Sequence, residues 1–171
     1  MKRMKRKTWT VCLALLCLAL LLTGCGKEQP AKEQAAQTEA ALTCAQWADR
    51  IQGADEFAQM TDVNEKYLEK ALLIQASALS DWAFRRDGEG ATPEMILVLR
   101  VKDGEDKAAV VQAAKDYLEE RILQYRDYQP DQLFKLENAK IMVRDDLIAL
   151  SVSPDAEKAA AALGAGWKRE E

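Results

Sequence analysis

Hydrophobic and polar residues follow three patterns along the 171-residue chain. Residues 11–22 are all apolar, whereas residues 26–41 contain no large apolar side chain. From residue 42 onward, apolar positions recur at the spacings of helices and strands. The pattern predicts an apolar leader, a polar connector that cannot bury a face, and one folded domain.

Two helices are predicted at the start of the folded domain. Trp47 and Ile51 share a face of the first helix, for which Thr43 is the expected N-cap and Gly53 the end. The second helical pattern covers residues 62–74. Its apolar side chains lie on one side of the helix and are Val63, Tyr67, Ala71 and Ile74.

A β-hairpin is predicted over residues 82–101. In its first strand, side chains from Trp82 onward alternate between the two faces. A loop that contains Gly and Pro follows at residues 87–93, and the second strand runs from Met95 to Val101. The second strand is apolar on both faces, whereas a half-solvated antiparallel strand would alternate. We therefore expect it to be central in the sheet, covered on both sides or by a partner.

The longest predicted helix begins at Asp103 and ends before Pro130. Its apolar positions form one continuous stripe at helical spacing. They are Val111, Ala114, Leu118, Ile122 and Tyr125.

A second hairpin and a short helix complete the domain. The residues Asp145 and Asp146 are the expected two-residue turn. This register pairs Val143 with Ile148, Ile141 with Leu150, and Ala139 with Val152. Ser153 is the expected cap of a last helix that has Pro154 at its first position.

These elements give the order α-α-β-β-α-β-β-α. Runs of paired strands separated by helices are typical of α+β proteins. We predict an antiparallel sheet of two β-hairpins with the helices packed on it.

A signal for lipid attachment lies at the end of the apolar leader. Five basic residues precede the leader, which at about 12 residues is too short to span a hydrocarbon core of about 30 Å. Leu22, Thr23 and Gly24 are the expected signal peptidase recognition residues, and Cys25 is the expected lipidation site. The alternative is an ordinary signal peptide followed by a chance cysteine.

The lipobox divides the chain into three parts. We expect residues 1–24 to be a lipoprotein signal peptide, residues 25–42 a flexible tether, and residues 43–171 a single α+β domain. Membrane lipid attached through Cys25 is then the anchor. The expected location is extracytoplasmic, on the outer face of the cytoplasmic membrane.

Charge and composition exclude several classes of function. The net charge is −4, and removal of the basic leader makes it about −9, so nucleic acid is not an expected partner. The chain has no His, which excludes Ser-His-Asp triads and Cys-His pairs. No metal or cofactor motif is present. Cleavage and lipidation leave Cys44 as the one free thiol, either buried as a small apolar side chain or reactive.

Several side chains outside the apolar faces are candidate site residues. The carboxylates of Asp55, Glu56, Asp81, Glu94, Asp145 and Asp146 could act in acid–base chemistry or bind a cation, but we expect them to be solvated surface. The cations Arg85, Arg86, Arg100 and Lys102 could bind an anionic polymer or headgroup, or pair with nearby acids.

The aromatic residues could line a groove for a glycan or peptide. The tyrosines Tyr117, Tyr125 and Tyr128 gather near the long helix. We expect core packing for Trp47, Trp82 and Tyr125 and exposure for Trp167.

Five segments in a fixed order resemble a known family. They are 92–96 (Thr-Pro-Glu-Met-Ile), the long helix, 128–130 (Tyr-Gln-Pro), 138–139 (Asn-Ala) and 151–155 (Ser-Val-Ser-Pro-Asp). Over residues 45–160 the chain resembles the family catalogued as domain of unknown function 4358. The resemblance implies a lipobox-bearing protein of Gram-positive, largely clostridial bacteria. It implies no activity.

Three hypotheses of function follow. The first is a noncatalytic binding or interaction module at the cell surface, which is not an enzyme. The second is a cell-wall hydrolase that uses carboxylates alone and needs two acids facing each other across a cleft. The third is an accessory subunit of a membrane complex.

Overall fold

The computed structural model describes residues 42–170. The expected lipobox residues Leu22, Thr23, Gly24 and Cys25 lie outside the described residues, as does all of the expected tether except Leu42. Within the described part, no helix has the length and apolar character needed to cross a membrane.

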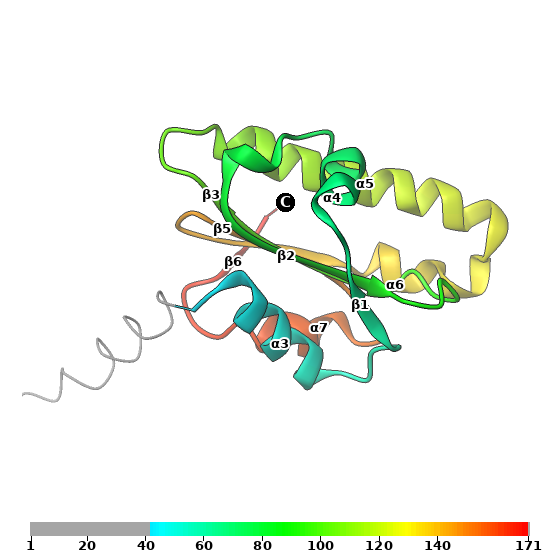
Figure 1. The fold of residues 1–171 in the computed structure, drawn as a ribbon. Helices are drawn as coiled ribbons and strands as arrows, with labels where there is room; N and C mark the ends of the chain where they lie inside the picture. Colours follow the sequence, from blue (N-terminus) through cyan, green and yellow to red (C-terminus); the bar gives the residue numbers. More distant parts are fainter. Residues whose placement is uncertain (1–41, 171) are drawn as a thin grey trace, which may run out of the picture. The chain divides into compact units, whose positions relative to one another are not determined.

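A six-stranded antiparallel sheet forms the middle of the domain (Figure 1). Its spatial order is β1-β2-β3-β5-β4-β6. Along the chain the strands are β1 Met60–Asp62, β2 Leu79–Asp87, β3 Met95–Val101, β4 Lys140–Arg144, β5 Leu147–Val152 and β6 Lys168–Arg169. The predicted α+β fold with two hairpins is confirmed, and the short strands β1 and β6 extend the sheet at its two edges.

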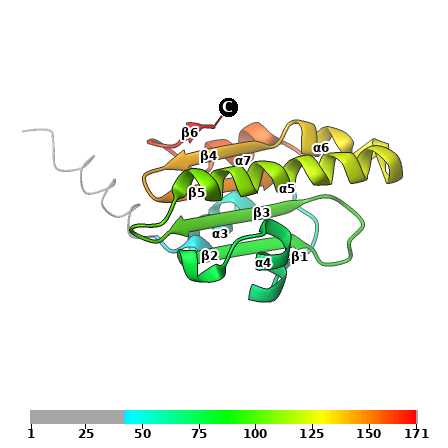
Figure 2. The ribbon, with the colours of Figure 1, turned by 90° about the horizontal axis from the view of Figure 1, so that it is seen from above.

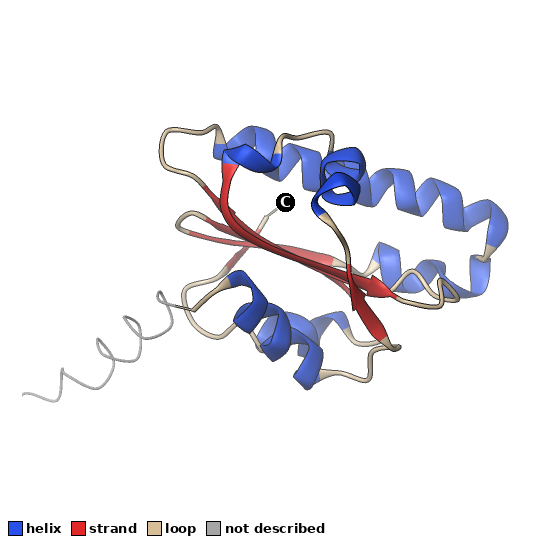
Figure 3. Ribbon diagram, in the orientation of Figure 1, coloured by secondary structure: helices blue, strands red, loops and turns tan. Residues whose placement is uncertain are grey.

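The doubly apolar strand β3 lies inside the sheet, between β2 and β5. Leu97 faces one hydrophobic core and Val98 faces the other, and both are fully buried. The expectation of a central strand covered on both faces is confirmed, because helices of this same chain cover each side (Figure 3).

Two helices cover one face of the sheet (Figure 2). They are α4 (Glu65–Leu72) and α5 (Lys107–Tyr128), which pack on each other as well as on the strands. Val111 and Ala114 of α5 are buried as predicted, and Leu118 packs partly buried against the same core. Val110 and Tyr117 are also buried, so the contact stripe is wider than predicted over the first half of the helix.

Helices α3 (Cys44–Ala54) and α7 (Ala156–Ala161) cover the opposite face. Trp47 of α3 is fully buried and meets Trp167 edge to face, with 5.3 Å between ring centroids. Trp167 is only 9% exposed, so the prediction that it is exposed is wrong. The strand β6 pairs with β4 beside it and carries the tryptophan back onto the core.

The second hairpin has the predicted register. Ile141 pairs with Leu150 and Val143 with Ile148. Asp145 in the turn has a φ of 49°, a left-handed conformation that Asp tolerates better than most residues. The turn therefore forms with Asp at the position where Gly is more usual.

Three predicted helix starts are wrong by two to four residues. The longest helix begins at Lys107 and not at Asp103, because the side chain of Asp106 accepts the Ala108 and Ala109 N–H groups. The second helix begins at Glu65, because the side chain of Asn64 accepts the Tyr67 N–H and Asp62 belongs to β1. The last helix begins after Asp155, whose side chain accepts the Lys158 N–H, and not after Ser153. At the first helix, Thr43 is the N-cap as predicted.

Three short elements connect the larger ones. They are the 3-10 turns Ala76–Ala78 and Pro130–Gln132 and the helix α6 (Leu133–Glu137). The helix α6 follows the turn Pro130–Gln132 and packs against α5.

Candidate functional site

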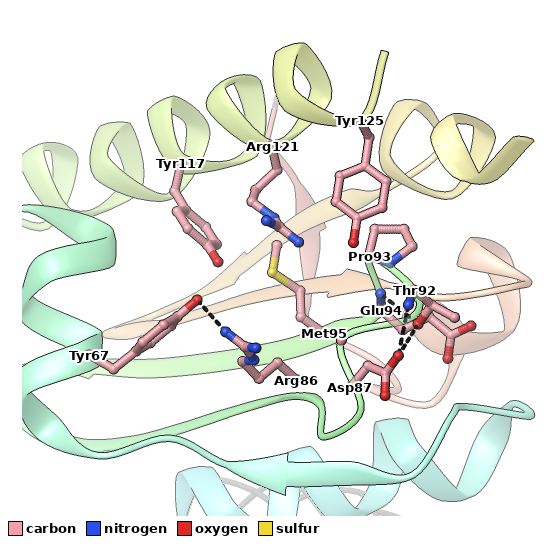
Figure 4. Close-up of a pocket in the computed structure, with 11 residues that line it drawn as sticks. Tyr67, Arg86, Asp87, Thr92, Pro93, Glu94, Met95, Tyr117, Arg121 and Tyr125 are labelled. Carbon is pink, nitrogen blue, oxygen red and sulfur yellow. Dashed lines mark hydrogen bonds between the residues drawn. The ribbon is translucent and has the colours of Figure 1, made fainter. Parts of the chain in front are cut away.

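A pocket of about 130 Å³ lies where α4, α5 and the β2–β3 connection meet (Figure 4). Its wall consists of Tyr67, Arg86, Asp87, Gly90, Thr92, Pro93, Glu94, Met95, Tyr117, Arg121 and Tyr125. The apolar packing of α4 and α5 on the sheet fixes the backbone around it. The polar ends of the side chains are thus held over a rigid frame.

Two arginines reach the pocket from opposite sides. Arg86 extends from β2, and its Nη1 donates to the Tyr67 hydroxyl at 3.0 Å. Arg121 extends from α5, and its Nη1 donates to Gln124 at 3.0 Å. Figure 4 shows both guanidinium groups directed into the space between the helix and the hairpin. No carboxylate of a described residue lies within ion-pair distance of either arginine.

Aromatic rings hold both guanidinium groups in place. The Arg86 guanidinium lies 5.2 Å from the ring centroid of Tyr67, and that of Arg121 lies 4.8 Å from the ring of Tyr125. Such cation–π contacts fix direction without removing the charge. The Nε atom of Arg121 is buried and has no hydrogen-bond partner among the described residues. It is a donor with unused capacity at the pocket wall.

Tyr67 and Tyr117 lie next to each other beside the arginines (Figure 4). Burial alone would raise the pKa of Tyr67, but hydrogen bonds from Tyr117 and Arg86 and the charges of both arginines outweigh burial and lower it. Burial and the neighbouring Tyr67 raise the pKa of Tyr117. The positive field of the arginines therefore favours negative charge at the Tyr67 oxygen.

Two buried acids line the same pocket, and both are fully engaged. The Asp87 carboxylate accepts the N–H groups of Glu89 at 3.0 Å and Thr92 at 2.7 Å. Burial opposes its ionisation, but these hydrogen bonds prevail and lower its pKa. The Glu94 carboxylate accepts from the Lys135 ammonium at 2.6 Å and from the Ala58 N–H at 2.6 Å.

Two further hollows lie beside the pocket along α5. One, of about 240 Å³, shares Tyr67, Tyr117 and Arg121 with the pocket. The other, of about 460 Å³, is lined by Gln124, Tyr125, Tyr128 and Gln129. A ligand group bound at the arginines thus has room for an attached body along the helix.

The predicted acids lie at separate places and do not form one site. Asp55 accepts the Asp155 N–H and Asp81 accepts the Cys44 N–H, so both have structural contacts. The solvated-surface prediction is wrong for Glu94, which is 4% exposed. No group of three potential metal ligands occurs among the residues that the structure describes.

The predicted arginine cluster does not form. Arg85 and Arg86 are adjacent in β2 and therefore lie on opposite faces. Arg85 pairs with Asp49 and Asp62, and Arg100 pairs with Asp146, as the alternative of pairing with acids predicted. Only Arg86 of this group reaches the pocket.

Cys44 is fully buried on the opposite face of the sheet. Burial, followed by the negative charge of Asp81, raises the pKa of its thiol. The structure therefore favours the small apolar side chain over the reactive thiol.

Sequence reasoning missed Arg121 as a site residue. The signal was present in the spacing, because Arg121 lies four residues from both Tyr117 and Tyr125 and shares their helix face. Tyr117 and Tyr125 line the pocket, in keeping with the groove alternative, whereas Tyr128 lies further along and is 85% exposed.

No curated protein and no solved structure matches the chain. A family model does match, over residues 54–153. The matched region runs from the end of α3 to the end of β5 and includes every residue that lines the pocket. The chain belongs to the family described as domain of unknown function (DUF4358).

Proposed function

We propose that this protein is a lipid-anchored lipoprotein on the outer face of the cytoplasmic membrane, and that its folded domain is a noncatalytic module that binds a small anion. The lipobox at Leu22–Cys25 supports the anchor. The pocket between α4, α5 and the first hairpin supports binding.

The two arginines without carboxylate partners carry the binding proposal. Elsewhere in the described domain, Arg85 and Arg100 each pair with a nearby acid. Arg86 and Arg121 instead contact neutral hydroxyl and amide oxygens and aromatic rings. Arg121 is half-buried and Arg86 is exposed, and neither charge is compensated by a carboxylate of a described residue, so an anionic ligand is the natural partner for this pair.

The contacts of the two buried acids disfavour a hydrolase mechanism. A carboxylate-dependent glycosidase needs one protonated acid with a raised pKa opposite a second, ionised one. The pKa of Asp87 is lowered, and its oxygens accept from its own loop. Glu94 is occupied by Lys135 and the Ala58 N–H. Neither acid is arranged to deliver a proton to a substrate.

The anchor is tested on protein isolated from membranes. Intact mass and N-terminal peptide analysis should show a lipid-modified Cys25 as the first residue, and Cys25→Ala should release the protein from the membrane fraction. The matched control is Cys44→Ala, which removes a thiol that has no part in attachment. An unmodified, secreted N-terminus would contradict the anchor.

Binding is tested by titration calorimetry of the full-length protein in detergent with acetate, sulfate and inorganic phosphate. We expect at least one of these anions to bind, and the double substitution Arg86→Gln and Arg121→Gln to abolish the signal. Arg126→Gln is the matched control, because it removes an exposed charge from the same helix outside the pocket. Equal binding by all variants, or no binding of any anion, would refute the pocket as the site.

A further inference from the structure

Two guanidinium groups approach the pocket from two different elements. Arg86 lies on the sheet and Arg121 on the helix above it, and each is fixed by its own aromatic ring. A carboxylate has two coplanar oxygens that one guanidinium fork can satisfy. Two guanidinium groups on separate sides of the pocket suit an anion whose oxygens point in more than two directions.

The donors of the pocket exceed what a carboxylate can use. Arg121 keeps a buried, unpartnered Nε, and each guanidinium has five N–H groups of which one is used in a hydrogen bond to a neighbour. The Tyr67–Tyr117 pair adds hydroxyl groups beside them. A phosphate group presents three or four oxygens and up to two charges at neutral pH.

The acids at the wall do not compete for these donors. Asp87 is directed to the N–H groups of Glu89 and Thr92, and Glu94 to Lys135. The pocket volume of about 130 Å³ is large enough for one tetrahedral oxyanion. The adjoining hollow of about 240 Å³ leaves room for a small body attached to that group.

From these observations we infer that the pocket binds a terminal phosphate group, as free phosphate or as a phosphomonoester, between Arg86 and Arg121. This inference rests on the proposed binding function and narrows it to one chemical class. A phosphodiester has one charge, so it would leave one arginine uncompensated.

The test is titration calorimetry of the full-length protein in detergent with four probes. They are inorganic phosphate, glycerol 3-phosphate, the diester glycerophosphocholine and acetate. We expect the two terminal phosphates to bind at least tenfold more tightly than the diester and acetate. Glycerol 3-phosphate should bind at least as well as free phosphate if the adjoining hollow accepts its body, and weaker binding would restrict the site to free phosphate.

Two substitutions locate the phosphate. Arg121→Gln should weaken phosphate binding at least tenfold. Arg121→Lys should restore part of the affinity, because lysine has the positive charge but lacks the two parallel N–H donors of a guanidinium group. Arg126→Gln should leave binding unchanged. Circular dichroism melting of each variant shows whether it is folded, and loss of binding with a preserved melting curve supports the inference.

The outcomes separate the inference from the proposed function. Tight acetate binding with weak phosphate binding would overturn the phosphate inference and leave an anion-binding module. Equal affinity for the diester would overturn a terminal phosphate as the ligand. No binding of any probe, together with no binding of sulfate, would overturn both.

Discussion

Asp87 is a buried carboxylate that holds its own loop. It is 3% exposed, and its oxygens accept two backbone N–H groups and the Thr92 hydroxyl. These bonds fix the connection between β2 and β3, which forms one wall of the pocket. A carboxylate that accepts several N–H groups is stabilised in its charged form.

We predict that Asp87→Asn lowers the free energy of unfolding at pH 7 by about 1–3 kcal/mol, as expected for lost charged hydrogen bonds. The pKa of Asp87 in the folded state lies below its ordinary 3.8, so its contribution is complete above that value and is lost as the pH falls through the folded-state pKa. Urea unfolding between pH 2 and 7 should therefore show a shallower acid decline for the variant. Asp103→Asn, at an exposed site, is the control and should match the native curve.

Single buried acids are difficult to predict because their partners are distant in sequence. Glu94 meets Lys135, 41 residues away, and Asp55 accepts the Asp155 N–H from 100 residues away. Neither contact can be predicted from the pattern of neighbouring residues in the sequence. Arg121 is the opposite case, because its spacing from Tyr117 and Tyr125 was sufficient to place it with them.

At the scale of elements, the second hairpin depends on a turn residue in an unfavourable conformation. Asp145 adopts a φ of 49°, where a β-branched residue is strongly disfavoured and glycine is not. The register of the hairpin places Ile141 and Val143 toward the α5 side of the sheet. The turn is therefore coupled to the packing of the core beneath α5.

We predict opposite effects for two substitutions at Asp145. Asp145→Gly should keep or raise the free energy of unfolding, and Asp145→Val should lower it by about 1–2 kcal/mol, because a left-handed residue with a branched side chain is strained. Equilibrium urea unfolding of both variants measures the difference. Glu137→Val, an exposed substitution outside the turn, controls for added hydrophobicity. Equal stability of the two Asp145 variants would contradict this account.

Long patterned elements were predictable and short ones were not. The strand β3 and helix α5 carry continuous apolar patterns, so their positions followed from spacing alone. The strands β1 and β6 have three and two residues, too few to show a period. Such strands form because a neighbouring strand offers hydrogen bonds, which is a tertiary effect.

Across the whole domain, the C-terminal segment closes the core on the α3 side of the sheet. Trp167 packs against Trp47, which lies 120 positions earlier in the chain. Trp167 was predicted to be exposed because it lies in a short tail after Gly166. Glycines Gly164 and Gly166, both with positive φ, instead allow the chain to turn back onto the sheet.

We predict that Trp167→Ala destabilises the domain by about 3 kcal/mol, since truncating a buried aromatic residue leaves a cavity. The near-ultraviolet circular dichroism of the paired tryptophans should weaken in the same variant. Urea unfolding gives the free energy. Tyr128→Ala is the matched control, because it truncates an aromatic side chain that is 85% exposed and should change stability by less than about 0.5 kcal/mol.

The pocket itself could be predicted only in part. Its residues come from α4, β2, the β2–β3 connection and α5, which no local pattern brings together. The sequence indicated the tyrosines of α5 as groove candidates and Arg86 as a candidate cation. The separation of Arg86 from Arg85, and its approach to Arg121, depend on which face of the sheet each helix covers.

The two edges of the sheet are formed by β1 and β6, with three and two residues. An open strand edge can pair with the same edge of another molecule, and short, charged edges prevent this. Lys168 and Arg169 form the whole of β6, so two such edges would repel each other. The domain can therefore be crowded against copies of itself without offering the β6 edge as a template for intermolecular β-sheet growth.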